Sequence, residues 1–217
     1  MATTYHQQVQ SFYAALAGVS KSVKIEIAPD DLTSLKLNNY KMCFAKRVGD
    51  NDYNVVWQAY DLYLQNNMFS WVPLYELFGT NQYKANIQVT VHTNKVPIHL
   101  GETAVLNSSG ILGAPKTGGS DLGFTLDNQY GSIHPGVNQL SVGIDGSQVS
   151  TPIYVAPNSI VMGQDFLQPV EKVLVWFEQN IQTSTIFSSA RSNSIEIDLT
   201  NTNAATRLYK GQKWTTP

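Results

Sequence analysis

Charged residues are scarce in this sequence: they make up 14% of its 217 residues, against about 25% in an average globular domain. The basic and acidic residues nearly balance, which leaves a formal net charge of −2. The chain therefore has no electrostatic footprint for a polyanion, and we expect no nucleic acid among its partners. Its polar surface must therefore consist mainly of the neutral side chains of Asn, Gln, Ser and Thr.

Cysteine and long apolar runs are scarce as well. The single cysteine, Cys43, excludes an internal disulfide and agrees with a reducing compartment. No apolar run approaches the roughly 20 residues that span a bilayer. The N-terminus lacks the positive start and the uninterrupted apolar stretch of a signal peptide. We therefore expect a cytoplasmic protein.

Motifs for catalysis, nucleotide binding and metal binding are also missing. There is no Gly-x-Ser-x-Gly motif, and in GAPKTGGS the pair Lys116-Thr117 precedes two glycines instead of following them, so the P-loop pattern fails. The four histidines share no close spacing with one another or with Cys43. We predict no catalytic residues, no metal and no cofactor, and we favour a function without catalysis.

An aromatic stretch, Asp52–Val91, organises the rest of the chain and contains two of the four tryptophans. Its flanks, Tyr53–Tyr63 and Ala85–Val91, alternate two sets of residues with the two-residue period of a half-buried strand. The central part, Leu64–Asn81, is interrupted by a proline and a glycine. We predict two strands joined by an aromatic loop.

Short strand patterns separated by turn residues continue along the chain. We expect strands at Ser22–Ile27, Tyr40–Val48, Val96–Leu106, Gly123–Leu126, Gln139–Ile144, Thr151–Val155, Pro169–Ile181, Ser194–Thr200 and Thr206–Thr215. Pro169–Ile181 is the best candidate for a central strand, because its middle is apolar on both faces. Nine or more strands at roughly 8–12-residue intervals predict a single all-β domain, residues 1–217, folded as an antiparallel β-sandwich of immunoglobulin-like or jelly-roll type. Asn107–Ser120, with four glycines, is expected to be a long surface loop.

One short amphipathic helix is predicted at residues 4–17. Tyr5, Val9, Phe12 and Leu16 fall on one face, and Gly18 ends the pattern. The helix can pack on the sandwich, mediate assembly or meet a membrane.

The candidate ligand-binding residues are aromatic and amide side chains. Aromatic rings offer flat faces for stacking, and carboxamides both donate and accept hydrogen bonds, as a sugar or a polar lipid headgroup requires. The first group is Tyr60, Tyr63, Asn66, Asn67, Trp71 and Tyr75, and the second is Asp127, Asn128, Tyr130 and His134. Some of these rings can instead form a hydrophobic cluster that caps the sandwich.

The leading prediction is a non-enzymatic binding protein for a neutral polar ligand such as a glycan, comparable to a lectin. The combination of an N-terminal amphipathic helix, a sandwich and an aromatic cluster resembles the arrangement in actinoporins and the related fungal fruit-body lectins. That resemblance implies an alternative, a membrane-active pore-forming protein whose N-terminal helix inserts. A further alternative is an enzyme or a small-molecule carrier with a pocket between the sheets. Low charge and open sheet edges also predict a homo-oligomer, most simply a dimer.

Overall fold

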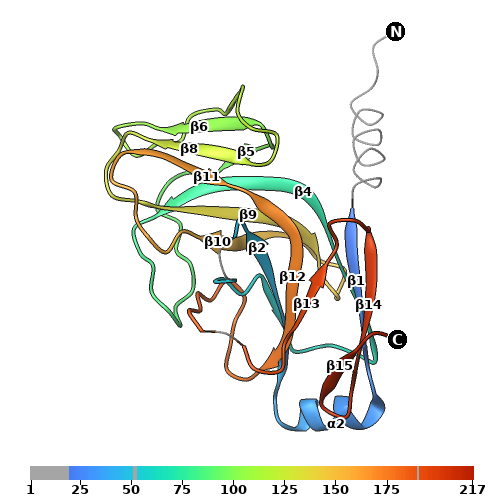
Figure 1. Cartoon of the computed structure of the whole chain (residues 1–217). Coiled ribbons are helices and arrows are strands. Elements are labelled where there is room, and N and C mark those ends of the chain that lie inside the picture. Colours follow the sequence, from blue (N-terminus) through green and yellow to red (C-terminus); the bar gives the residue numbers. More distant parts are fainter. Residues whose placement is uncertain (1–19, 51–52, 190) are drawn as a thin grey trace.

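The computed structural model describes residues 20–50, 53–189 and 191–217, which form three β-sheets and one α-helix (Figure 1). The elements are β1 (Lys21–Ile27), α2 (Pro29–Leu37), β2 (Lys41–Val48), β3 (Gln58–Tyr60), β4 (Asn66–Thr80), β5 (Val96–Ile98), β6 (Glu102–Leu106), β7 (Lys116–Thr117), β8 (Phe124–Asn128), β9 (His134–Val142), β10 (Gln148–Val155), β11 (Gly163–Leu167), β12 (Pro169–Glu178), β13 (Ile195–Asp198), β14 (Ala204–Lys210) and β15 (Lys213–Thr215).

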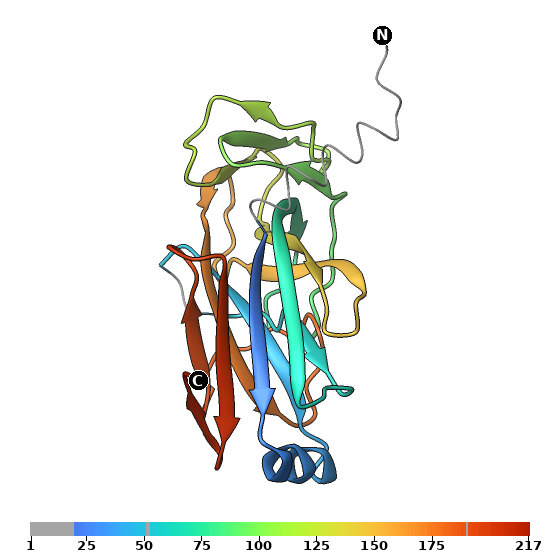
Figure 2. The same cartoon turned by 90° about the vertical axis from the view of Figure 1, so that its right-hand side faces the viewer.

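The largest sheet has the order β10-β9-β4-β1-β14-β15, and β5 adds to it by pairing with β4. A second sheet has the order β13-β12-β2-β3, and a third has the order β11-β8-β6-β7. Figure 2 shows β14, β1 and β4 side by side, with the third sheet at the end of the molecule opposite α2.

The core lies where the first two sheets face each other. Phe44 of β2 stacks on Phe69 of β4, with ring centroids 4.3 Å apart, and Trp57 meets Phe69 edge-on at 5.0 Å. One continuous buried cluster includes residues of all three sheets. The large aromatic side chains are therefore concentrated in the interior, where they stabilise the fold by burying apolar area.

Several strands lie where the alternating patterns predict them. β1, β2, β12 and β13 agree closely with the expected segments. β12 lies between β2 and β13, as expected for a central strand, and Val173, Val175 and Trp176 are buried. The all-β prediction is confirmed, although two pairs, β1 with β14 and β6 with β8, are parallel, so the expectation of a purely antiparallel arrangement is wrong.

The predicted loop Leu64–Asn81 is wrong, because this segment forms the 15-residue strand β4. Asn67, Phe69 and Trp71 alternate inward as in any strand. Pro73 is tolerated because it lies where the register between β4 and β9 shifts, so that its missing N–H interrupts no regular ladder.

The strand predicted at Ala85–Val91 is also wrong, because this segment forms no regular strand. It runs beside residues 184–186 with a single bridge, Gln88 to Thr185. Asn86 and Ser184 have positive φ angles of 65° and 68°, which interrupt regular pairing on both sides. Alternation alone therefore did not produce a strand.

The remaining differences concern turns and the helix. α2 was not expected: Pro29, which follows the predicted strand Ser22–Ile27, begins a helix that has Asp30 and Asp31 in its first turn. The segment Val96–Leu106 divides into β5 and β6, and the terminal segment folds into the hairpin β14–β15. The loop expected at Asn107–Ser120 is interrupted only by the two-residue strand β7. The helix predicted at residues 4–17 lies outside the described residues.

Candidate functional site

Most of the aromatic candidates lie in the core. Tyr63, Trp71 and Tyr75 are at most 4% exposed, so none of them presents a ring face to a ligand at the surface. Asn67 is also buried. Its Nδ2 donates to the carbonyl oxygens of Ile25 and Leu64, and its Oδ1 accepts from the Leu64 N–H. Tyr60 is half-buried against Phe44, and only Asn66 is exposed. The structure does not bring this group together as a surface site.

The second group of candidates divides into three places. Asn128 is buried and ties loops together, whereas Tyr130 is exposed at a loop tip. Asp127 accepts a hydrogen bond from Gln129. His134 stacks on Tyr83, with ring centroids 6.0 Å apart, and its Nδ1 lies 2.8 Å from the Ala156 carbonyl oxygen. Of these four, His134 lies beside the pocket described below.

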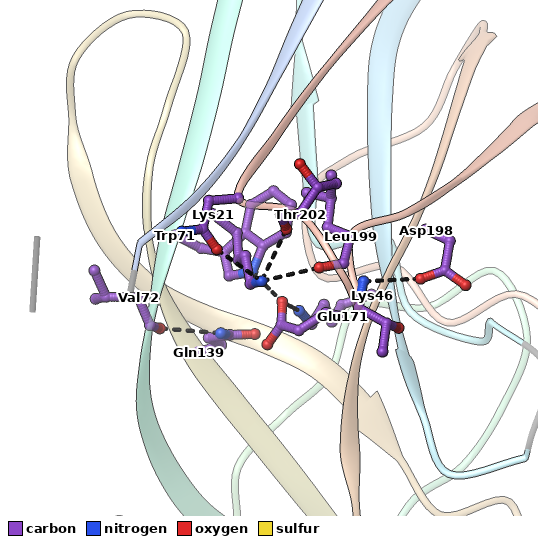
Figure 3. Close-up of polar contacts among 11 residues, drawn as sticks. Lys21, Lys46, Trp71, Val72, Gln139, Glu171, Asp198, Leu199 and Thr202 are labelled. Carbon is purple, nitrogen blue, oxygen red and sulfur yellow. Dashed lines mark hydrogen bonds and ion pairs between the residues drawn. The ribbon is translucent and has the colours of Figure 1, made fainter. Parts of the chain in front are cut away.

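An ion pair between Lys46 and Glu171 lies in the interior, between the largest sheet and the β13-β12-β2-β3 sheet (Figure 3). Lys46 of β2 donates from Nζ to Oε2 of Glu171 on β12 at 2.6 Å, and the indole Nε1 of Trp71 donates to the same oxygen at 2.8 Å. The ammonium also lies 4.7 Å from the centroid of the Trp71 ring. Lys21 is satisfied separately by the carbonyl oxygens of Leu199 and Thr202 and by Asn203.

Burial lowers the pKa of Lys46 to about 8, although the neighbouring Glu171 opposes that shift. Burial and the Glu171 charge raise the pKa of the Tyr75 phenol. A lysine with a lowered pKa is a candidate catalytic group only where a substrate can reach it. The Lys46 side chain is fully buried, and none of the hollows described below is lined by Lys46 or Glu171. We therefore assign this pair to the packing of the core.

Other reactive groups are no better placed. Cys43 is buried, and burial raises the pKa of its thiol, which makes it inert as a nucleophile. Within residues 20–50, 53–189 and 191–217, no three His, Cys, Asp or Glu side chains come together as a metal site.

A pocket of about 450 Å³ lies on the outer face of the β13-β12-β2-β3 sheet, and we call it the Tyr53 pocket. It is lined by Tyr53, Asn54, Tyr83, Pro157, Leu174, Phe187, Ser188, Ser189, Arg191 and Ser194. Three aromatic rings supply apolar faces, and three serines supply hydroxyls. This size and mixture are typical of small-molecule sites.

The polar groups of the Tyr53 pocket are arranged to bind a hydrogen-bond donor. Asn54 is 6% exposed, and its Nδ2 donates to the Val155 carbonyl at 2.7 Å. Its Oδ1 is buried and has no donor at hydrogen-bond distance within the described residues, and Tyr83 is a neighbour whose phenol interacts with the Asn54 side chain. A buried acceptor without a donor is costly, and either the neighbouring Tyr83 hydroxyl or a donor on a ligand can supply the missing hydrogen bond.

Charge in the Tyr53 pocket is neutralised. The Nε of Arg191 lies 3.0 Å from Oε2 of Glu178, and its guanidinium covers the Phe187 ring at 4.6 Å. Burial and the nearby Glu196, to which the Tyr53 hydroxyl donates at 3.0 Å, raise the pKa of Tyr53, and burial raises the pKa of Tyr83, so both phenols stay neutral. The pocket therefore suits a neutral polar ligand.

Next to the Tyr53 pocket lie two smaller hollows of about 390 and 360 Å³. They share Tyr40, Phe177, Gln179 and Ser192, and we call them together the amide groove. Its walls are rich in carboxamides, from Asn38, Gln179, Asn180, Asn193 and Gln212. Arg191 lines both the groove and the Tyr53 pocket, so the two are neighbours.

Sequence reasoning missed the residues of both hollows. They come from separate segments, and single residues such as Tyr83 carry no pattern. The one usable signal was the run from Ser188 to Ser194, SSARSNS, which is polar and lies directly before a strand. Its residues Ser188, Ser189, Arg191 and Ser194 line the Tyr53 pocket, and Arg191, Ser192 and Asn193 line the amide groove.

Comparison with known protein families, with curated proteins and with solved structures found no match for this chain. Among the helices that the structure describes, none is long and apolar enough to cross a membrane.

Proposed function

We propose that this protein is a non-enzymatic binding protein that takes a neutral, hydroxyl-rich ligand, such as a glycan, in the Tyr53 pocket. The observation that supports the proposal is the Tyr53 pocket, in which the rings of Tyr53 and Tyr83 lie beside the carboxamide of Asn54. A sugar ring presents apolar C–H groups to an aromatic face and hydroxyls to a carboxamide, so it meets both requirements at once.

The ligand is further proposed to be a chain instead of a single sugar. The amide groove continues beyond Arg191 and offers carboxamides together with the rings of Tyr40 and Phe177. A longer glycan would place its first unit in the Tyr53 pocket and later units along the groove, and its affinity would then rise with chain length.

A glycan array followed by calorimetry tests the proposal. We expect a neutral glycan to bind, and Tyr83→Ala to weaken its affinity by about tenfold, because one stacking face is worth about 1 kcal/mol or more. Tyr130→Ala, which removes an exposed tyrosine distant from the pocket in sequence, is the matched control and should bind normally. The absence of any neutral ligand, or equal losses in both variants, would refute the assignment.

A length series separates the pocket from the groove. If the groove takes part, Gln212→Ala should reduce the affinity for the longer glycans and leave the shortest bound ligand unaffected. An affinity that does not change with length would restrict the site to the Tyr53 pocket.

The proposal includes three expectations about the whole protein. We propose a β-sandwich of immunoglobulin-like or jelly-roll type with mixed sheets, and the stacking of Phe44 on Phe69 supports the packing of two facing sheets. We propose a cytoplasmic location, supported by the lone reduced Cys43. Self-association, most simply into a dimer, is proposed through the β10 edge of the largest sheet, and light scattering would detect it.

A further inference from the structure

Three loops at one end of the third sheet expose large apolar side chains. Ile111 is 55% exposed, Tyr130 48%, Val161 66% and Met162 71%. The loops follow β6 and β8 and precede β11, and because β6 and β8 are parallel and β11 is antiparallel to β8, all three meet at the same end of the sheet. We call these four side chains the loop tips.

Two of the three loops, residues 128–133 and 157–163, are held together by one buried side chain. Nδ2 of Asn128 donates to the carbonyl oxygens of Gly131 at 2.5 Å, Ile160 at 3.0 Å and Val161 at 3.2 Å, while its Oδ1 accepts from the backbone N–H of Tyr130 at 3.0 Å. These hydrogen bonds hold the loops of Tyr130, Val161 and Met162 in place, so the exposure of these side chains does not result from fraying of the chain.

The backbone of these loops is also satisfied from within. Oδ1 of Asn107 accepts from the N–H groups of Ser109 and Ile111, and the Asn107 N–H donates to the Ile111 carbonyl oxygen. Ile133 and Ile160 exchange backbone hydrogen bonds in both directions. Internal satisfaction of backbone groups is the condition that an apolar phase imposes, because lipid offers no replacement for water.

No charge surrounds the loop tips along the chain. The segments 107–113, 128–133 and 157–163 contain no Asp, Glu, Lys or Arg. Anionic membranes are recognised through Lys and Arg, so these loops have nothing to offer them. A neutral lipid surface imposes no such requirement, and it accepts apolar tips together with the amphipathic ring of a tyrosine at its interface.

We propose that the loop tips bind the surface of an electrically neutral bilayer, with Val161 and Met162 entering the lipid and Tyr130 lying at the headgroup level. This contact differs from the Tyr53 pocket and does not depend on it. It also differs from insertion of an N-terminal helix, because it uses only residues of the three loops.

Flotation of the full chain with phosphatidylcholine vesicles tests the proposal. The double variant Val161→Ser/Met162→Ser should reduce bound protein about tenfold or more, because two exposed apolar side chains lose their transfer to lipid. The matched control is Leu37→Ser, which removes an apolar side chain that is 77% exposed at the end of α2, and it should bind as the wild type does. Added salt should change little, since no charges take part.

A fluorescent reporter locates the contact. In the variant Met162→Trp, the emission should shift to shorter wavelengths when phosphatidylcholine vesicles are added, and the shift should be absent from Leu37→Trp. A wild-type protein that does not float, one that floats only with phosphatidylserine, or equal losses in both serine variants would overturn the proposal. So would a dimer that Val161→Ser/Met162→Ser converts to a monomer, because the tips would then belong to an interface between two copies.

Discussion

The core around Lys46 and the loop tips reverse the usual distribution of side chains. The Lys46 side chain is fully buried, whereas Met162 is 71% exposed. Lysine is almost never buried unless it is paired, and scattered exposed apolar side chains are ordinary, but four on adjoining uncharged loops are not.

The surroundings of the two regions explain why each exists. Lys46 is surrounded by partners from other strands, Glu171 and Trp71, so the unfavourable burial of its charge is offset inside the molecule. Val161 and Met162 lie on a hydrogen-bonded loop, and their side chains remain exposed. The first region therefore affects stability, and the second affects binding.

The largest effect is expected from breaking the ion pair on one side. Glu171→Gln leaves the ammonium of Lys46 buried without a counter-charge and should lower the free energy of unfolding by about 3 kcal/mol. Lys46→Met removes the charge at similar volume and should cost about 1 kcal/mol or less. Urea unfolding of both variants measures the difference. Equal costs would show that the pair contributes no more than ordinary packing.

A smaller effect concerns pH. Because the pKa of Lys46 is about 8 in the folded protein and near 10.5 when unperturbed, the unfolded chain binds more protons between these values, and stability contributed by this residue rises with pH across that window. Relative to Lys46→Met, the wild type should gain about 1–2 kcal/mol between pH 8 and pH 10.

The comparison with Lys46→Met is needed because other groups act in the opposite direction. Burial raises the pKa of Cys43 and of Tyr75, and each lowers stability as pH rises through its unfolded value. Both residues are present in the two proteins, so their contributions cancel in the difference. Parallel stability curves for the two proteins would contradict the lowered pKa of Lys46.

The smallest effect is expected at the loop tips. Val161→Ser/Met162→Ser should change the free energy of unfolding by no more than about 0.5 kcal/mol, because neither side chain is packed in the core. Urea unfolding at neutral pH gives this value. A loss comparable to that of Glu171→Gln would mean that the tips support the fold.

The sequence predicted the strands whose surroundings are simple. β1 and β13 alternate cleanly, and β12 is apolar on both faces, so local pattern and final burial agree. β4 was missed because Pro73 is compatible with a strand only at a register shift, which depends on β9. α2 was not predicted either, because Pro29 is compatible both with the end of a strand and with the first turn of a helix.

The candidate site was harder to predict because burial decides it. Trp71 is of a residue type that often stacks on sugars, but the facing sheet covers it and its indole Nε1 donates to Glu171. In the sequence Asn54 is one of several polar residues in the alternating stretch Tyr53–Tyr63, and only its neighbours Tyr83 and Phe187, distant in sequence, make it part of a pocket. Such groupings arise from the tertiary fold and leave no local pattern.

The location of the ligand is tested most directly by titrating the isotope-labelled protein with the best glycan and following backbone amide shifts by nuclear magnetic resonance. We predict that the perturbed amides cluster at Tyr53, Asn54, Tyr83 and the run from Phe187 to Ser194, while those of Val161 and Met162 remain unchanged. Shifts confined to β4 or to the loop tips, or no saturable shifts with any neutral glycan, would contradict the proposed site.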